Sequence, residues 1–457
     1  MQPALWKHQA QAVAFAEELP AALWHMGMGT GKSRCAIELA RRMNARRILI
    51  LCPKSVCAAW RDQVATFGGG MVTATLDHGS VAKKKEQAKR IKLRAEVHGD
   101  PVVVVVNYES ARREPLAAWL LRQQFDLLVL DESHRIKSPS GSTSRWVSRL
   151  AKTCGKRVAL TGTPMPHSPL DIYAQFRALK PEVFGTSFVR FRERYARMGG
   201  FQGKQVMGFQ NVEDLQARMA RYTFQADRSV LQLPEATHTK IPVTLKPKAR
   251  QLYDDLDRDF VAQVLDGEIT AANAMVKLLR LQQVTSGRVP ISGAHAFGLK
   301  EIDTAKKDAL KDLLSDLEHG EPVVVFGRFA ADLLTVHDAA KACGLPSLEL
   351  SGQTNQLAAW QRGEAPILAV QIQSGGTGID LTRARYCCYL STGFSLGDYE
   401  QSLARVHRPG QGRTVSYYHF VASASVDEQV YDALRQRKQV VETVLDGIKL
   451  QTPTTRS

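Results

Sequence analysis

The sequence lacks the features that mark disulfide-rich, zinc-binding and membrane-spanning proteins. Its seven cysteines are odd in number and form no C-x-x-C pair, which argues against a disulfide framework and against a zinc site. No apolar run is long enough to cross a bilayer, and residues 1–13 lack the basic start and apolar core of a secretory signal. We therefore expect a soluble protein of the cytoplasm.

Aromatic and acidic residues are also scarce. Phe, Trp and Tyr together make up 7% of the chain, which disfavours the extensive base stacking used by single-strand binders. Asp and Glu number 45 against 61 Lys and Arg, so the formal net charge is +16. A surplus of this size suits a polyanionic partner such as nucleic acid, although a generally basic surface explains it equally well.

The length of 457 residues exceeds one ordinary core and suggests two or three domains. Short apolar runs alternate with helix-period stretches in the first and last thirds, and such runs are typical of strands buried on both faces of a parallel sheet. The runs are 21–24, 47–52, 102–106, 127–130, 158–160, 323–326, 367–372, 386–390 and 416–421. We predict an α/β protein with parallel-sheet domains at 1–180 and 305–446, a mainly helical insertion and linker at 181–304, and a flexible tail at 447–457.

A glycine-rich segment, HMGMGTGKSR at residues 25–34, resembles a phosphate-binding loop but departs from its usual pattern. The pattern G-x-x-x-x-G-K-[ST] has a glycine where this chain has Met26. The segment nevertheless follows the apolar run 21–24 and precedes a helix-period stretch at 33–43. Strand, turn and helix in this order are the context that a phosphate loop requires, and an ordinary glycine turn is the alternative.

The residue types within this segment suit phosphate binding. Gly29 and Gly31 would permit close approach of the backbone, and Lys32 would neutralise phosphate charge. Ser33 would offer its hydroxyl to magnesium.

Two acidic residues, Asp131 and Glu132, directly follow the apolar run 127–130, where a parallel sheet binds its ligand. Asp131 can hold magnesium, and Glu132 can orient and deprotonate an attacking water. The alternative, a pair of solvated acids opening a loop, does not explain why they end an apolar strand beside a phosphate loop. Thr161 and Thr163 of the LTGTP motif suit a hydrogen-bonded relay that senses a γ-phosphate, or only a turn.

The second sheet domain carries two motifs that could also contact phosphate. QSGGTGIDLT at 373–382 follows an apolar run and can present backbone N–H groups and hydroxyls to phosphate oxygens. QSLARVHRPGQ at 401–411 places Arg405 and Arg408 three residues apart, on one face if the segment is helical. Two such arginines could stabilise charge on a γ-phosphate, and a basic surface helix is the alternative.

Together these motifs resemble the motor of superfamily-two helicases, and most closely the SWI/SNF-type DNA translocases. The resemblance rests, in chain order, on GMGTGKS, LDESHRIKSPSGSTSR, LTGTP, SGGTGIDLT and QSLARVHRPGQ, and covers nearly the whole chain. TGTPMPHSPLDIYAQF is similar to compact members encoded by phages and bacteria. If the protein is phage-encoded, the expected cytoplasm is that of the host. The family's loop needs only G-x-G-K-[ST], and Met26 is therefore no obstacle.

The resemblance implies two RecA-like domains that close on ATP and Mg²⁺, with the metal held by Ser33 and Asp131 and with Gln9 reading adenine. The implied nucleotide contacts are Gln9, Gly29, Thr30, Gly31, Lys32, Ser33, Asp131, Glu132, Gly378, Arg405 and Arg408. It also implies movement along duplex DNA without strand separation, which requires phosphate contacts that ignore sequence. The candidates, at or near the ends of predicted strands, are Lys54, Ser55, Arg328, Ser374 and Thr377.

The chain departs from the family at a few positions. Many members carry acidic residues where this chain has Met26 and Gly27, and often asparagine where it has His167. The stretch 350–360 lacks an expected arginine. A strand-separating DNA or RNA helicase, and an ATP-gated nucleic-acid clamp with little hydrolysis, stay open as alternatives. A protein partner that directs the motor is also compatible with the sequence, which leaves the oligomeric state open.

Overall fold

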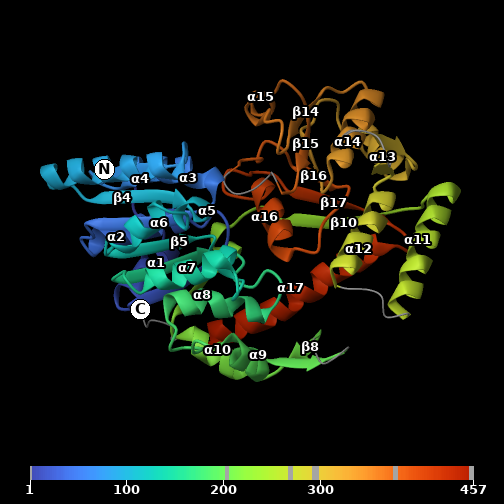
Figure 1. Ribbon diagram of the computed structural model, residues 1–457. Coiled ribbons are helices and arrows are strands. Elements are labelled where there is room, and N and C mark those ends of the chain that lie inside the picture. The colour runs from blue at the N-terminus through green and yellow to red at the C-terminus, as the bar shows by residue number, and fades with distance from the viewer. Residues whose placement is uncertain (1–2, 201–204, 266–270, 291–297, 374–378, 452–457) are drawn as a thin grey trace. The chain divides into compact units, whose positions relative to one another are not determined.

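The structure is a computed structural model that describes residues 3–200, 205–265, 271–290, 298–373 and 379–451. The chain divides into two compact units. Unit 1 comprises residues 1–232 and 437–457, and unit 2 comprises residues 233–436. Each unit is built on its own sheet, and Figure 1 labels β4 and β5 of the first sheet and β10, β14, β15, β16 and β17 of the second.

Unit 1 contains, within the described residues, a seven-stranded sheet in which all neighbouring strands are parallel. In pairing order the strands are β3 (Val72–Leu76), β4 (Val102–Asn107), β2 (Arg47–Cys52), β5 (Leu127–Asp131), β6 (Lys156–Thr161), β1 (Ala21–Met26) and β9 (Thr223–Ala226). Strands that neighbour in space but not in sequence are joined through helices, as parallel pairing requires.

Both faces of this sheet are buried, which explains its unbroken apolar strands. Alternate residues face one cluster with α1, α2 and α3, for example Ile48 and Ile50 of β2. The intervening Leu49 and Leu51 are fully buried as well, so they face the other side of the sheet, since successive strand residues point to opposite faces. Helix α8 contacts β1 and β6. Burial on both sides replaces the polar–apolar alternation of a half-exposed sheet.

The remaining elements of unit 1 follow the strands along the chain. They are α1 (Lys7–Glu17), α2 (Lys32–Arg42), η1 (Lys54–Val56), α3 (Cys57–Phe67), α4 (Val81–His98), α5 (Tyr108–Ala111), α6 (Leu116–Leu121), η2 (Ser133–Ile136), α7 (Ser142–Ala151), η3 (Pro169–Asp171), α8 (Ile172–Leu179), α9 (Phe188–Tyr195), the antiparallel pair β7 (Ala196–Gly199) and β8 (Gln205–Phe209), α10 (Val212–Ala220) and η5 (Arg228–Leu231).

Unit 2 contains a second parallel sheet, six-stranded over the part of the chain that the structure describes. Its order is β10 (Ala236–Val243), β17 (Val415–Ala422), β16 (Tyr386–Tyr389), β13 (Val323–Gly327), β15 (Ile367–Gln371) and β14 (Ser347–Leu350). One face packs a core that includes Phe326, Trp360 and Tyr417. The edge strand β10 comes from far upstream of its neighbour β17 and pairs with it over eight residues.

The other elements of unit 2 are mostly helices. They are α11 (Pro247–Leu265), α12 (Ala271–Thr285), the antiparallel pair β11 (Arg288–Pro290) and β12 (Leu299–Glu301), α13 (Ala305–Asp316), α14 (Ala330–Ala342), α15 (Leu357–Gln361), α16 (Leu396–Val406) and the start of α17 (Val426–Gln451).

The predicted architecture of two parallel-sheet domains is confirmed, and every apolar run predicted as a strand forms one. Strands β3, β9, β10 and β14 were not predicted. The segment 181–304, expected to be mainly helical, contains α9 to α12 and also contributes β9 to the first sheet and β10 to the second. These four strands lie at or next to sheet edges, where partial exposure breaks the continuous apolar pattern.

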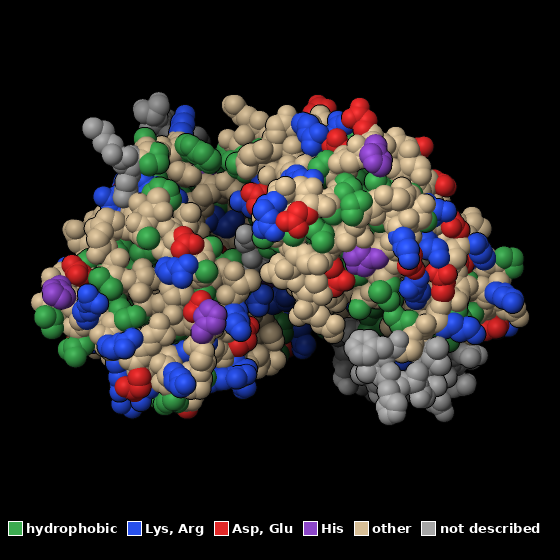
Figure 2. Space-filling view, turned by 90° about the horizontal axis from the view of Figure 1, so that it is seen from above, with side chains coloured by type: hydrophobic (Ala, Val, Ile, Leu, Met, Phe, Trp, Pro, Cys, Tyr) green, Lys and Arg blue, Asp and Glu red, His purple; other side chains and the backbone are tan. Residues whose placement is uncertain are grey.

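The surface carries charges of both signs. Figure 2 shows Lys and Arg side chains spread over the face turned toward the viewer, with Asp and Glu side chains among them. No helix in the described parts of the chain is long and apolar enough to cross a membrane. The basic run of residues 82–94 lies on α4, where Lys84 is buried and donates to the Ser110 hydroxyl at 2.9 Å.

Candidate functional site

The turn between β1 and α2 carries the predicted phosphate loop. Met26 is the last residue of β1, and its side chain is fully buried in the core. Met26 therefore packs as part of the strand, and the loop begins after it. Gly29 and Gly31 have φ of 84° and 85°, in the left-handed region that favours glycine. A Cβ on Gly31 would lie 2.2 Å from Nε2 of Gln9. The backbone conformation therefore favours glycine at position 31, and a larger residue would also displace the Gln9 amide.

Lys32 begins α2, and its ammonium is held at this loop. The Lys32 Nζ donates to the carbonyl oxygens of Met26 at 3.0 Å and Gly27 at 3.2 Å. The buried Thr30 donates its hydroxyl to the Gly27 carbonyl oxygen at 2.7 Å, and Ser33 follows Lys32 in the helix. Because the first N–H groups of a helix have no intrahelical acceptor, the start of α2 suits an anion such as phosphate.

Gln9 of α1 braces the loop from the other side. Its Nε2 donates to the Thr30 carbonyl oxygen at 3.1 Å, and its Oε1 accepts from the Trp6 backbone N–H at 3.0 Å. A ring nitrogen of His8 lies 2.9 Å from the same Thr30 oxygen. Beyond these two bonds with described residues, the Gln9 amide keeps one N–H and one lone pair, a combination that matches the N7 and N6 groups of adenine.

Asp131, the last residue of β5, is a buried carboxylate with a defined orientation. Its Oδ2 accepts from the Trp60 indole N–H at 2.8 Å, and its Oδ1 accepts from the Glu132 backbone N–H at 3.0 Å. The Tyr108 hydroxyl donates to the Asp131 carbonyl oxygen at 2.8 Å. Burial and then the adjacent Glu132 raise the pKa of Asp131 to about 6, against the lowering effect of Trp60 and Lys32.

Glu132 is also buried, and its backbone is strained. Its φ of 49° lies in the left-handed region, which is unfavourable for a residue with a side chain. Its Oε2 has no hydrogen-bond partner among the described residues and lies 3.4 Å from Nδ1 of His134. A strained, buried acid beside a phosphate loop is an arrangement found more often at functional sites than in structural cores.

The LTGTP motif approaches the acidic pair through His134. The His134 Nδ1 lies 3.3 Å from Oγ1 of Thr161, and the Thr163 backbone N–H donates to that oxygen at 3.0 Å. The Thr163 hydroxyl is buried without a hydrogen-bond partner in the part of the chain that the structure describes. Glu132, His134 and Thr161 therefore form a continuous polar contact from β5 to the end of β6.

The oxygen donors of this site fit a magnesium ion whose remaining ligands come from a phosphate and from water. Within the described residues, no group of three or more His, Cys, Asp or Glu side chains could hold a metal. Mg²⁺ commonly takes one or two carboxylates and completes its shell with phosphate oxygens and water. Asp131 with the Ser33 hydroxyl matches that requirement.

Arg405 and Arg408 lie on and just beyond α16 in unit 2. Arg405 is 7% exposed in the last turn of the helix, which ends at Val406. Arg408 follows the helix, so the two arginines do not share one helical face. The Arg408 guanidinium donates to the Ile379 carbonyl oxygen at 3.1 Å, and the Leu381 N–H donates to the Arg405 carbonyl oxygen at 3.1 Å. The two C-terminal motifs therefore pack against each other within this unit.

The candidate nucleic-acid residues have different surroundings. Lys54 and Ser55 are exposed on η1, directly after β2. Arg328 follows β13, and its guanidinium is half-buried, bonds Oε1 of Gln282 and lies over the Phe329 ring at 5.5 Å. Burial lowers the pKa of Arg328. The remaining candidates lie outside the described residues: Ser374, Thr377 and the nucleotide candidate Gly378.

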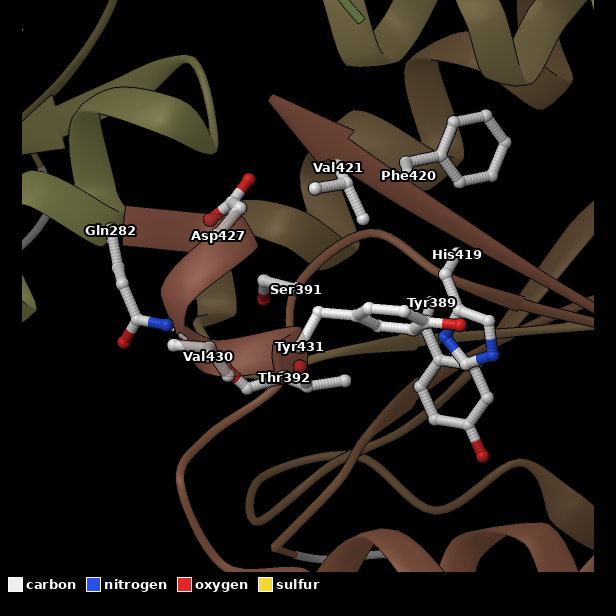
Figure 3. Close-up of a pocket in the computed structure, with 10 residues that line it drawn as sticks. All are labelled: Gln282, Tyr389, Ser391, Thr392, His419, Phe420, Val421, Asp427, Val430 and Tyr431. Carbon is white, nitrogen blue, oxygen red and sulfur yellow. Dashed lines mark hydrogen bonds between the residues drawn. The ribbon is translucent and has the colours of Figure 1, made fainter. Parts of the chain in front are cut away.

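A small cavity of about 20 Å³ in unit 2 lies among Tyr389, His419, Tyr431 and their neighbours (Figure 3). Gln282 at its edge donates to the Thr392 carbonyl oxygen at 2.9 Å. Because pockets for small molecules usually measure on the order of 300 Å³ or more, this cavity is a gap in a polar core and too small for a nucleotide.

Sequence reasoning missed several residues of the site in unit 1. His8 contacts the phosphate loop, His134 contacts both Glu132 and Thr161, and Trp60 binds Asp131. His8 and His134 each lie within two residues of a predicted site residue, so their position was a usable signal. Trp60 is 71 residues from Asp131, and no local pattern indicates that contact.

The chain matches two family models. Residues 9–287 match the SNF2-related domain, and residues 305–410 match the helicase conserved C-terminal domain. A putative protein p41 from Acyrthosiphon pisum secondary endosymbiont phage 1 is 24% identical over 453 residues, covering 93% of this chain and 94% of that protein.

Other similar proteins are longer. The DNA annealing helicase and endonuclease ZRANB3 of Bos taurus is 23% identical, covering 92% of this chain and 38% of its own length. An uncharacterized ATP-dependent helicase of Mycoplasma pneumoniae is 22% identical, covering 87% and 37%. This chain therefore spans under two fifths of these two proteins.

Among solved structures, the Sulfolobus solfataricus SWI2/SNF2 ATPase core in complex with dsDNA aligns with a TM-score of 0.44 and 17% identity, covering 100% of this chain and 96% of that one. Because the SNF2-related match alone covers more than half of the sequence, the chain belongs to the SNF2-related family of helicase-like ATPases.

Proposed function

We propose that this protein is an ATP-driven translocase that moves along duplex DNA without reading its sequence. One observation carries the proposal: Asp131 ends β5, Glu132 follows it, and Lys32 begins the helix after the β1 turn, so all three belong to the carboxyl ends of strands of one parallel sheet, the edge at which such sheets bind ligands. The family to which the chain belongs, and the similar proteins that are named helicases, support ATP-driven action on nucleic acid.

In this proposal the loop between β1 and α2 holds the phosphates of ATP, and Lys32 turns from the Met26 and Gly27 carbonyl oxygens toward them. Asp131 and Ser33 would hold Mg²⁺, which neutralises charge on phosphate oxygens. Glu132 accepts the proton of the attacking water, a task suited to a buried carboxylate oxygen that accepts no hydrogen bond from the described residues.

Gln9 selects adenine with the amide N–H and the oxygen lone pair that its bonds to Thr30 and Trp6 do not use. Thr161 and Thr163 report the state of the phosphate through His134. Arg405 and Arg408 supply positive charge to the γ-phosphate, as the family resemblance implies.

Lys54 and Ser55 contact the DNA backbone from the exposed turn after β2. Arg328, Ser374 and Thr377 are further candidates for this contact.

The first test is ATP hydrolysis with and without duplex DNA. We expect duplex DNA to stimulate turnover in the wild type, Lys32→Ala to abolish it, and Glu132→Gln to bind ATP with turnover at least about a hundredfold lower. A wild-type protein without DNA-stimulated turnover would contradict the proposal. Unchanged turnover in Glu132→Gln would remove that residue as the base.

A second experiment separates translocation from strand separation. A triplex-displacement assay reports movement along intact duplex, whereas release of a strand from tailed DNA or RNA duplexes reports unwinding. We expect triplex displacement without strand release. Strand release at a comparable rate would assign the protein as a helicase in the strict sense.

A further inference from the structure

Asp131 is held by aromatic donors that come from two other segments of unit 1. Trp60 of α3 donates its indole N–H to the side chain, and Tyr108 of α5 donates its hydroxyl to the carbonyl oxygen, each at 2.8 Å. Trp60 is 2% exposed and Tyr108 is 1% exposed. An apolar ring would fill the same space at either position, so these polar atoms do more than pack the core.

Both donors belong to segments that adjoin the candidate nucleic-acid surface. Helix α3 begins directly after η1, which exposes Lys54 and Ser55, and Trp60 lies in its first turns. Tyr108 begins α5 directly after β4, the strand next to β2. Trp60 and Lys54 lie on consecutive helical segments. A shift of η1, which carries Lys54, would therefore move the indole N–H that donates to the Asp131 carboxylate.

Resting on the proposed function, we propose that Trp60 is a positioning residue that fixes the Asp131 carboxylate for Mg²⁺ and links it to the turn of Lys54. Among the described residues, each carboxylate oxygen accepts one hydrogen bond, from the Trp60 indole and from the Glu132 N–H, and keeps a further lone pair for a metal. Partners that orient a metal ligand in this way typically change metal affinity by roughly 10–100-fold when they are removed.

The central experiment measures nucleotide binding rather than turnover. We expect Trp60→Phe to raise the Mg²⁺ concentration needed for half-maximal binding of a fluorescent ADP by roughly tenfold or more. The stimulation of ATP hydrolysis by duplex DNA falls in parallel. Trp146→Phe is the matched control, because Trp146 is also in unit 1, is 4% exposed, and its indole N–H has no hydrogen-bond partner among the described residues.

A second variant removes the N–H while keeping the shape of the ring. Benzothienylalanine, incorporated only at position 60, replaces the indole N–H by sulfur, and urea unfolding checks that stability is retained. If Trp60→Phe fails to fold, the Mg²⁺ requirement of the benzothienylalanine protein tests the positioning role of Trp60 in its place. If the analogue and Trp146→Phe have the same Mg²⁺ requirement as the wild type, the positioning role is overturned.

A double-mutant cycle tests the link to the DNA-facing turn. We expect Lys54→Ala to reduce DNA stimulation less in the Trp60→Phe background than in the wild type, since the path is already broken. Additive effects would overturn the link. A wild type that hydrolyses ATP without any DNA stimulation would contradict the proposed function instead, so the two failures are distinguishable.

Discussion

At the scale of single residues, Glu132 combines a buried carboxylate with a left-handed backbone, at φ of 49°. Short stretches of sequence indicate its pairing with Asp131, and they also indicate the loop of Gly29, Gly31 and Lys32. The strained φ of Glu132 is a product of the fold, because it depends on how β5 passes into η2.

This strain leads to a stability prediction. Replacing Glu132 by glycine removes the left-handed penalty and a buried carboxylate oxygen that accepts no hydrogen bond from the described residues. We expect Glu132→Gly to raise the free energy of unfolding by about 1 kcal/mol, measured in urea, while turnover is lost.

Gln124 provides the control, because it has φ of 47° and is exposed in the same unit. Gln124→Gly should gain comparable backbone stability and keep turnover. A Glu132→Gly variant less stable than the wild type would show that Glu132 contributes to the fold more than its conformation costs.

At the scale of elements, the second sheet packs a histidine where charge is disfavoured. His419 of β17 is 3% exposed, stacks on Tyr389 with ring centroids 5.0 Å apart, and lies near His238 and Tyr399. Burial, with a smaller effect from His238, lowers the pKa of His419 to about 3. The folded protein therefore keeps this ring neutral at pH values at which the unfolded chain protonates it.

The sign of the effect follows from this difference. Below an unfolded pKa of about 6.5 the unfolded state binds the proton and the folded state does not, so stability falls as pH decreases. Between pH 7.5 and pH 5 we expect His419 to account for a loss of about 2 kcal/mol in unfolding free energy.

Urea unfolding at the two pH values, monitored by a spectroscopic signal from unit 2, measures this loss of unfolding free energy. His419→Gln should show a correspondingly smaller dependence on pH, whereas His319→Gln, at an exposed position, should behave as the wild type does. Equal pH dependence in His419→Gln and the wild type would contradict the prediction.

The strands show where sequence pattern is sufficient and where it is not. β2, β4 and β5 are buried on both faces, so apolar runs identify them. β10 reads ATHTKIPV, is mostly exposed, and pairs with a strand that lies far along the chain, at Val415–Ala422. Its identity depends on that distant partner, and the same holds for the contact between Trp60 and Asp131.

At the scale of the whole molecule, the position of β10 affects where the chain can be divided. A fragment of residues 305–436 lacks β10, which leaves the edge of β17 without its eight paired residues. It also lacks Thr285, whose hydroxyl donates at 2.8 Å to the buried carboxylate of Asp427 at the start of α17. Open sheet edges promote association between chains.

We therefore expect residues 233–436 to be monomeric and to unfold cooperatively, and residues 305–436 to aggregate. Size-exclusion chromatography and thermal unfolding of the two fragments provide the comparison. A soluble, cooperatively folded 305–436 fragment would show that β10 is dispensable for the second sheet.

The position of Trp6 gives the protein an intrinsic optical signal. Trp6 is 50% exposed and contacts Gln9 through its backbone, whereas Trp24, Trp60, Trp146 and Trp360 are at most 4% exposed. A soluble quencher such as acrylamide will therefore reach Trp6 more readily than these four. Occupancy of the site beside Gln9 can be followed by tryptophan emission in the unlabelled protein, with Trp6→Phe as the blank.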